Sequence, residues 1–165
     1  MTPATVVEKL RTSIPGFDLI ANGGLPKGRT TLVSGTAGSG KTVMAVQFLA
    51  AGILENDEPG VFVTFEESPD DIRENLRSLN WDISLWEQEH KWQFVDASPE
   101  IGEDLVVVGQ YDLAALLARI ENAVRQVGAK RVSMDSLGAI FSRFHEKRLV
   151  RYELFRIVSA LKKWA

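Results

Sequence analysis

The chain has 165 residues, of which 45% are hydrophobic and 25% are charged, which is the composition of one globular domain and argues against disorder. Its formal net charge of −3 gives no general attraction to nucleic acid or to an anionic membrane. The sequence has no cysteine, no signal peptide in its first ten residues and no apolar run near the ~18 residues that span a bilayer, so we expect a cytoplasmic protein without a membrane segment.

Strand-like and helix-like segments alternate along most of the chain. We expect residues 1–12 to form an N-terminal arm and residues 13–165 to form one domain, which begins with a turn-rich loop at 13–28. The alternation predicts a mostly parallel sheet in a three-layer α/β/α sandwich. The hydrophobic patterns predict strands at 30–34, 61–65, 92–96 and 131–134, and helices at 41–54, 69–79, 81–90, 113–127 (with Asp112 as N-cap) and about 148–164.

Residues 35–42 have the sequence Gly-Thr-Ala-Gly-Ser-Gly-Lys-Thr, which fits the phosphate-binding loop G-x-x-x-x-G-K-[ST]. Its glycines let backbone N–H groups turn toward a phosphate, while Lys41 supplies charge to the β- and γ-phosphates and Thr42 supplies a hydroxyl to Mg²⁺. The alternative is a glycine-rich turn before a core helix, and the strand and helix predicted on either side argue against it. The residues expected to bind the nucleotide are Gly35, Thr36, Gly38, Ser39, Gly40, Lys41, Thr42 and Val43.

Acidic residues follow three other predicted strands. Because the carboxyl ends of parallel strands form the ligand-binding edge of an open sheet, we expect these acids near the loop. Asp135 is predicted to hold Mg²⁺ together with Thr42, and one of Glu66 and Glu67 to activate the attacking water, for which we favour Glu66. The alternative interpretation makes each of these acids a solvated helix cap. For Asp96, a structural role is favoured.

Five stretches of the chain occur together, in the same order, in one known group of proteins. They are Gly16-Phe17-Asp18, Gly23–Gly28, the phosphate-binding loop, Phe62–Pro69 and Arg131–Ser136. With them the chain resembles the RecA-like ATPases and, among these, the N-terminal ATPase domain of the KaiC family of circadian-clock ATPases and autokinases. The resemblance covers nearly the whole chain after Arg11, and the double glutamate is more specific than the loop.

The resemblance implies a hexameric ring that holds ATP and Mg²⁺ between subunits and hydrolyses ATP slowly, with clock proteins as partners. It implies that Glu66 and Glu67 are the catalytic pair and that Ser78 lies near the nucleotide. The family's second domain phosphorylates itself on serine and threonine, and no residue of this chain carries that activity. Two alternatives stay open, a RecA-type ATPase of DNA recombination or repair and a nucleotide-gated oligomerisation module without turnover.

The sequence departs from the family at its C-terminal side. The family continues after the last helix with a strand that bears phosphate-sensing polar residues and lies next to the phosphate-loop strand, whereas this sequence stops at Ala165. We therefore expect a sheet that is incomplete at the C-terminus and a chain that is part of a longer one.

Overall fold

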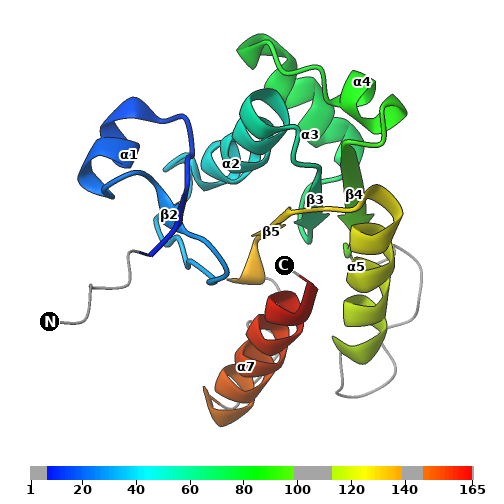
Figure 1. Ribbon diagram of the computed structural model, residues 1–165. Coiled ribbons are helices and arrows are strands. Elements are labelled where there is room, and N and C mark those ends of the chain that lie inside the picture. The colour runs from blue at the N-terminus through cyan, green and yellow to red at the C-terminus, as the bar shows by residue number, and fades with distance from the viewer. Residues whose placement is uncertain (1–6, 99–112, 139–146, 165) are drawn as a thin grey trace, which may run out of the picture.

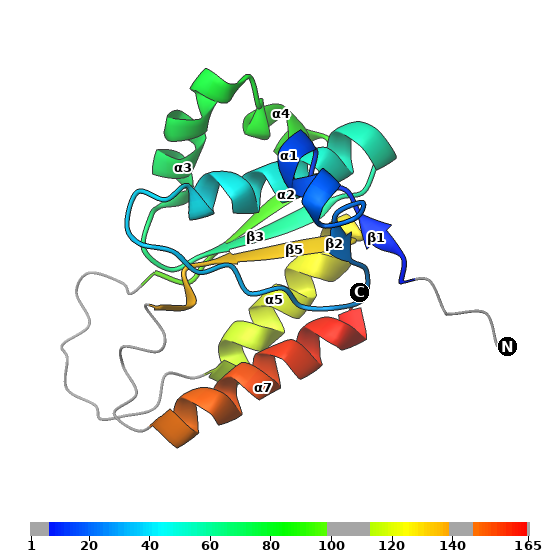
Figure 2. The same cartoon turned by 90° about the vertical axis from the view of Figure 1, so that its left-hand side faces the viewer.

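The computed structural model describes residues 7–98, 113–138 and 147–164. A parallel sheet lies at its centre, with helices on both faces (Figures 1 and 2). The strand order is β4 (Trp92–Asp96), β3 (Gly60–Thr64), β5 (Arg131–Asp135). One face carries α2 (Lys41–Asn56), α3 (Pro69–Leu76) and α4 (Ile83–Gln88), and the other carries α5 (Leu113–Val127) and α7 (Lys147–Trp164). The predicted three-layer α/β/α sandwich is thus confirmed.

The central strand β3 is buried on both faces, and its side chains alternate between two cores. Val61 and Val63 pack with α5 and α7, whereas Phe62 packs with α2, α3 and α4. On the α2 side Phe62 stacks on Trp92 of β4 at a ring-centroid distance of 5.9 Å. A continuous apolar run is what a parallel strand covered by helices requires, which explains why this strand was predictable from its sequence.

Local capping signals set the ends of several helices. The hydroxyl of Ser68 accepts a hydrogen bond from the Asp71 N–H at 3.2 Å, and Pro69 occupies the first position of α3. The predicted helix 69–79 is confirmed as α3 followed by a 3₁₀ turn, η1 (Arg77–Leu79). The predicted N-cap of α5, Asp112, lies outside the described residues. None of the helices in the described ranges is both long enough and apolar enough to cross a membrane.

The predicted strand at residues 30–34 is wrong. These residues do not pair with any described strand, and Leu32 and Val33 are 70% and 43% exposed. Within the described chain β5 pairs only with β3, so its other edge is open. A strand requires a hydrogen-bonded neighbouring strand. Residues 30–34 have the composition of a strand, but they have no such neighbour among the described residues.

The loop predicted at residues 13–28 is also wrong in part, because it contains regular structure. Helix α1 (Pro15–Ile20) lies within it, and β2 (Leu25–Pro26) pairs antiparallel with β1 (Lys9–Leu10). The buried carboxylate of Asp18 accepts hydrogen bonds from the Thr12 hydroxyl at 2.7 Å and the Thr12 N–H at 3.1 Å. These bonds fix the chain before the helix, and the proline at the first helical position sets its start.

Candidate functional site

The predicted phosphate-binding loop is an exposed turn that runs into the N-terminus of α2. Gly38 and Gly40 have φ angles of 75° and 81°, which glycine adopts without steric cost. Gly40 is the N-cap of α2, and no side chain caps the first N–H groups of that helix. Because these groups and the helix dipole attract anions, the local structure fits a phosphate. The Lys41 ammonium folds back and donates to the Thr36 carbonyl at 2.9 Å.

A hydroxyl and a carboxylate meet beside this loop. Thr42, in the first turn of α2, donates from Oγ1 to Oδ2 of Asp135 at 2.5 Å, and Asp135 is the last residue of β5. Both are partly buried, and both offer oxygen ligands of the kind that Mg²⁺ prefers. No group of three or more histidine or acidic residues in the described ranges could hold a metal ion alone. A Mg²⁺ ion here would therefore need further oxygens, as it does when it binds together with phosphates and water.

The two glutamates after β3 point to different neighbours. Glu66 accepts a hydrogen bond at Oε1 from the Ser136 hydroxyl at 3.0 Å, so it faces the residue next to Asp135. The Glu67 carboxylate faces α3, where Asn75 Nδ2 lies 3.4 Å from its Oε2, and its backbone carbonyl accepts from the buried Thr64 hydroxyl at 2.5 Å. The geometry therefore groups Glu66 with Asp135 and ties Glu67 to the helix that follows.

Two other predicted residues lie in local turns. Ser78 is exposed in η1, and its hydroxyl donates to the Asn75 carbonyl at 3.5 Å. Among the described residues it makes no hydrogen bond to the phosphate-binding loop, so its place near a nucleotide stays a prediction. Asp96 ends β4 and accepts from the Ser98 N–H at 2.9 Å, the pattern of a carboxylate that stabilises a turn.

The sequence did not assign roles to Ser136, Thr64 or Asn75, although each holds one of the glutamates. Ser136 could have been found from its position, because it directly follows the acid at the end of β5. The contact from Asn75 depends on how α3 packs, and its residue type carries no signal for it.

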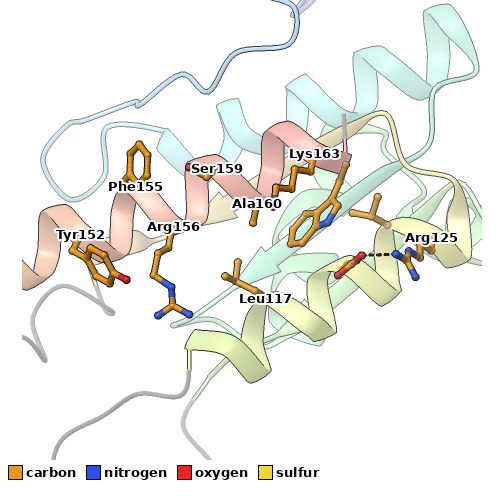
Figure 3. A pocket seen from close by; sticks show the side chains of 11 residues that line it. Leu117, Arg125, Tyr152, Phe155, Arg156, Ser159, Ala160 and Lys163 are labelled. Atoms are coloured by element: carbon orange, nitrogen blue, oxygen red, sulfur yellow. Dashed lines mark hydrogen bonds and ion pairs between the residues drawn. The ribbon is translucent and has the colours of Figure 1, made fainter.

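A cavity of about 680 Å³ lies between α5 and α7, on the other side of the sheet from the loop (Figure 3). Tyr152 and Phe155 of α7 line it and are 60% and 69% exposed, and Leu117 of α5 points toward α7. None of its lining residues belongs to the predicted nucleotide site. The cavity therefore adds nothing to the chemistry at the strand ends.

Comparison with known proteins gives consistent matches. The sequence profile of the family described as "ATPase: KaiC" matches residues 10–165. The chain is 58% identical to circadian clock protein KaiC3 of Synechocystis sp. and 52% identical to circadian clock oscillator protein KaiC of Synechococcus elongatus, over 95% of its length in each case. It is 53% identical to circadian clock oscillator protein KaiC 1 of Synechocystis sp. over 98% of its length. The matches cover 31%, 30% and 31% of these relatives, so the chain spans about a third of their length.

Proposed function

Because the chain belongs to the KaiC family of ATPases, we propose that it binds ATP with Mg²⁺ at residues 35–42 and hydrolyses the terminal phosphate bond. One observation carries this proposal: the Thr42–Asp135 contact brings the end of β5 to the N-terminus of α2. Glu66 is hydrogen-bonded to Ser136, the residue that follows Asp135. An anion site, two oxygen ligands and a carboxylate therefore share one edge of the sheet. Phosphoryl transfer to water needs that combination.

Each residue of the proposed site has a separate role in binding or hydrolysis. The backbone N–H groups at the start of α2 and the Lys41 ammonium hold the β- and γ-phosphates. Thr42 and Asp135 would hold Mg²⁺, which when bound neutralises charge that develops on the phosphate oxygens. The Glu66 carboxylate takes a proton from the attacking water, and the hydrogen bond from Ser136 occupies one of its oxygens and leaves the other for that water.

We further propose that the chain works in the cytoplasm as part of a hexameric ring, with ATP between subunits and clock proteins as partners. The names of its relatives support a role in a circadian clock. The loop residues 35–40 are all exposed, which leaves their outer side accessible to a neighbouring subunit. Serine/threonine autokinase activity is a proposal for the whole protein only, since no residue of the predicted nucleotide site supplies a phosphate acceptor.

Two variants test the hydrolysis proposal in the full-length protein. Lys41→Ala should weaken binding of a fluorescent ATP analogue, because it removes the cation that contacts the phosphates. Glu66→Gln should keep that binding and lower ATP turnover by about 10²–10⁴-fold, the usual contribution of a general base. Unchanged turnover in both variants would disprove an ATPase with this site.

Matched controls separate the roles. Glu67→Gln changes a neighbouring carboxylate that faces α3, so it should lower turnover less than Glu66→Gln. Lys91→Ala removes a lysine whose ion pairs are with Asp57 and Glu89, away from the loop, and should bind ATP normally. Stimulation of turnover by single-stranded DNA would instead favour a recombination ATPase, and ATP-driven assembly without phosphate release would favour an oligomerisation module.

A further inference from the structure

Strand β5 presents a polar face to the phosphate-loop helix. Three alternate residues of the strand each make a hydrogen bond to α2, at positions spaced three residues apart along that helix. The three contacts, which we call the β5–α2 ladder, are Arg131 to the Phe48 carbonyl at 2.8 Å, Ser133 to the Ala45 carbonyl at 2.9 Å, and Asp135 to the Thr42 hydroxyl at 2.5 Å. The ladder therefore ends at the proposed Mg²⁺ ligands.

The ladder is buried at the end away from the site. Arg131 is 2% exposed and Ser133 is 8% exposed, whereas the other residues of the strand, Val132 and Met134, pack against the core on the α5 side. A polar side chain in such a place costs free energy unless it is hydrogen-bonded, and both of these are. Hydrogen bonds, which are directional, therefore join this face of β5 to α2. Apolar contacts at the same positions would allow the helix to slide along the strand.

The spacing of the ladder restricts how α2 can move on β5. Two residues of a strand advance about 6.6 Å, whereas three residues of a helix advance about 4.5 Å and stop about 60° short of a full turn. Contacts at three successive levels oppose both sliding and rotation of the helix. The Ala45 and Phe48 carbonyls lie inside α2, so the bonds from Ser133 and Arg131 place the helix and are not needed to form it.

The buried end of the ladder is anchored to two further segments. The Arg131 guanidinium donates to the Glu58 carboxylate at 2.8 Å and to the Arg11 carbonyl at 2.9 Å, and it lies over the Phe48 ring at 4.8 Å. These contacts fix the first level of the ladder against the loop before β3 and the chain before α1.

From this geometry we infer that Ser133 is a positioning residue for the Mg²⁺ site. It acts through the helix, because its hydrogen bond to the Ala45 carbonyl holds α2 at the position along β5 where the Thr42 hydroxyl contacts Asp135. The inference rests on the proposed function for the identity of the ligand, but the coupling between Ser133 and Thr42 belongs to the protein without any ligand.

The first experiment uses the protein without nucleotide. Thr and Val have nearly the same shape, so Ser133→Thr and Ser133→Val differ mainly in the hydroxyl. Each is combined with Thr42→Val, and the unfolding equilibrium constants are measured in urea. If the two sites are independent, the double change alters the unfolding equilibrium constant by the product of the factors for the two single changes. For Ser133→Val combined with Thr42→Val, we expect the unfolding equilibrium constant to differ from this product by about fivefold or more. For Ser133→Thr combined with Thr42→Val, we expect it to equal the product. A simple product for both would overturn the inference.

The second experiment measures the Mg²⁺ concentration that gives half of the Mg²⁺-dependent gain in binding of a fluorescent ATP analogue. Loss of an outer hydrogen bond commonly weakens a metal site by 10-fold or more. We expect Ser133→Val to raise this concentration by about tenfold, with unchanged binding in EDTA, and Ser133→Thr to restore it. Asp82→Ala, which removes the N-cap of α4, is the control for lost stability alone.

The outcomes separate the two proposals. A raised Mg²⁺ requirement in Asp82→Ala as large as that in Ser133→Val would overturn the positioning role. If the unchanged protein bound no nucleotide, the proposed function would fail, and the coupling between Ser133 and Thr42 would still decide whether the ladder places the helix.

Discussion

Gly52, in the fourth turn of α2, leaves space for the Arg131 side chain. A Cβ at this position would lie 2.6 Å from Nε and 2.7 Å from Cδ of Arg131. Alanine is favoured over glycine inside a helix by up to about 1 kcal/mol, so Gly52→Ala would stabilise an isolated helix. In the folded protein the guanidinium cannot move aside, because it is buried and bonded to Glu58 and to the Phe48 carbonyl.

The magnitude of the Gly52→Ala effect follows from these contacts. Overpacking costs about 1–3 kcal/mol and the loss of one charge-assisted hydrogen bond costs about 1.5–3 kcal/mol. After the gain in helix propensity is subtracted, we expect the free energy of unfolding to fall by about 1.5–5 kcal/mol. Urea unfolding followed by tryptophan fluorescence measures it. In the control Gly16→Ala the new Cβ meets nothing within 4 Å, so stability should not fall. A Gly52→Ala protein as stable as the unchanged protein would refute the reasoning.

Two further changes test the cap of α3 and its ion pair, both by urea unfolding. Ser68→Ala should lower the free energy of unfolding by about 1 kcal/mol, because it removes the N-cap of α3, and Ser68→Thr should retain most of it; equal losses would contradict the capping role. Glu87→Ala breaks a two-bond pair with Arg73, at 2.8 and 2.7 Å, whose hydrogen bond raises the pKa of Arg73. Glu87→Ala should lower the free energy of unfolding by about 1–2 kcal/mol. The control Glu74→Ala, which removes an exposed ion pair, should lower it by less than about 0.5 kcal/mol. Equal losses would show that the burial of the Arg73–Glu87 pair does not matter.

The elements that the sequence predicted well carry local signals. Strand β3 follows from a short apolar run, and β4 and β5 follow from short segments that mix apolar and polar residues. Their parallel pairing follows from the helices between them. Ser68 and Pro69 marked the start of α3 within the sequence itself. The proximity of Asp135 to the phosphate-binding loop could be predicted for the same reason, since parallel strands end at one edge of the sheet.

The features that could not be predicted depend on partners far along the chain. Residues 30–34 have the composition of a strand, yet no described strand pairs with them. Arg131 would be placed on the surface by its residue type, but its partners lie 73 to 120 positions away and bury it. The directions of Glu66 and Glu67 likewise depend on Ser136 and Asn75, which come from other elements.

The contact between Thr42 and Asp135 joins residues 93 positions apart, and the other two levels of the ladder join residues 88 and 83 positions apart. Loops of this length close slowly, because their entropy is lost before any contact forms. During translation at about 5–20 residues per second, Thr42 is made roughly 5–19 s before Asp135. In that interval the phosphate-binding loop exists without its acid, so a nascent chain acquires this site only when β5 has joined the sheet.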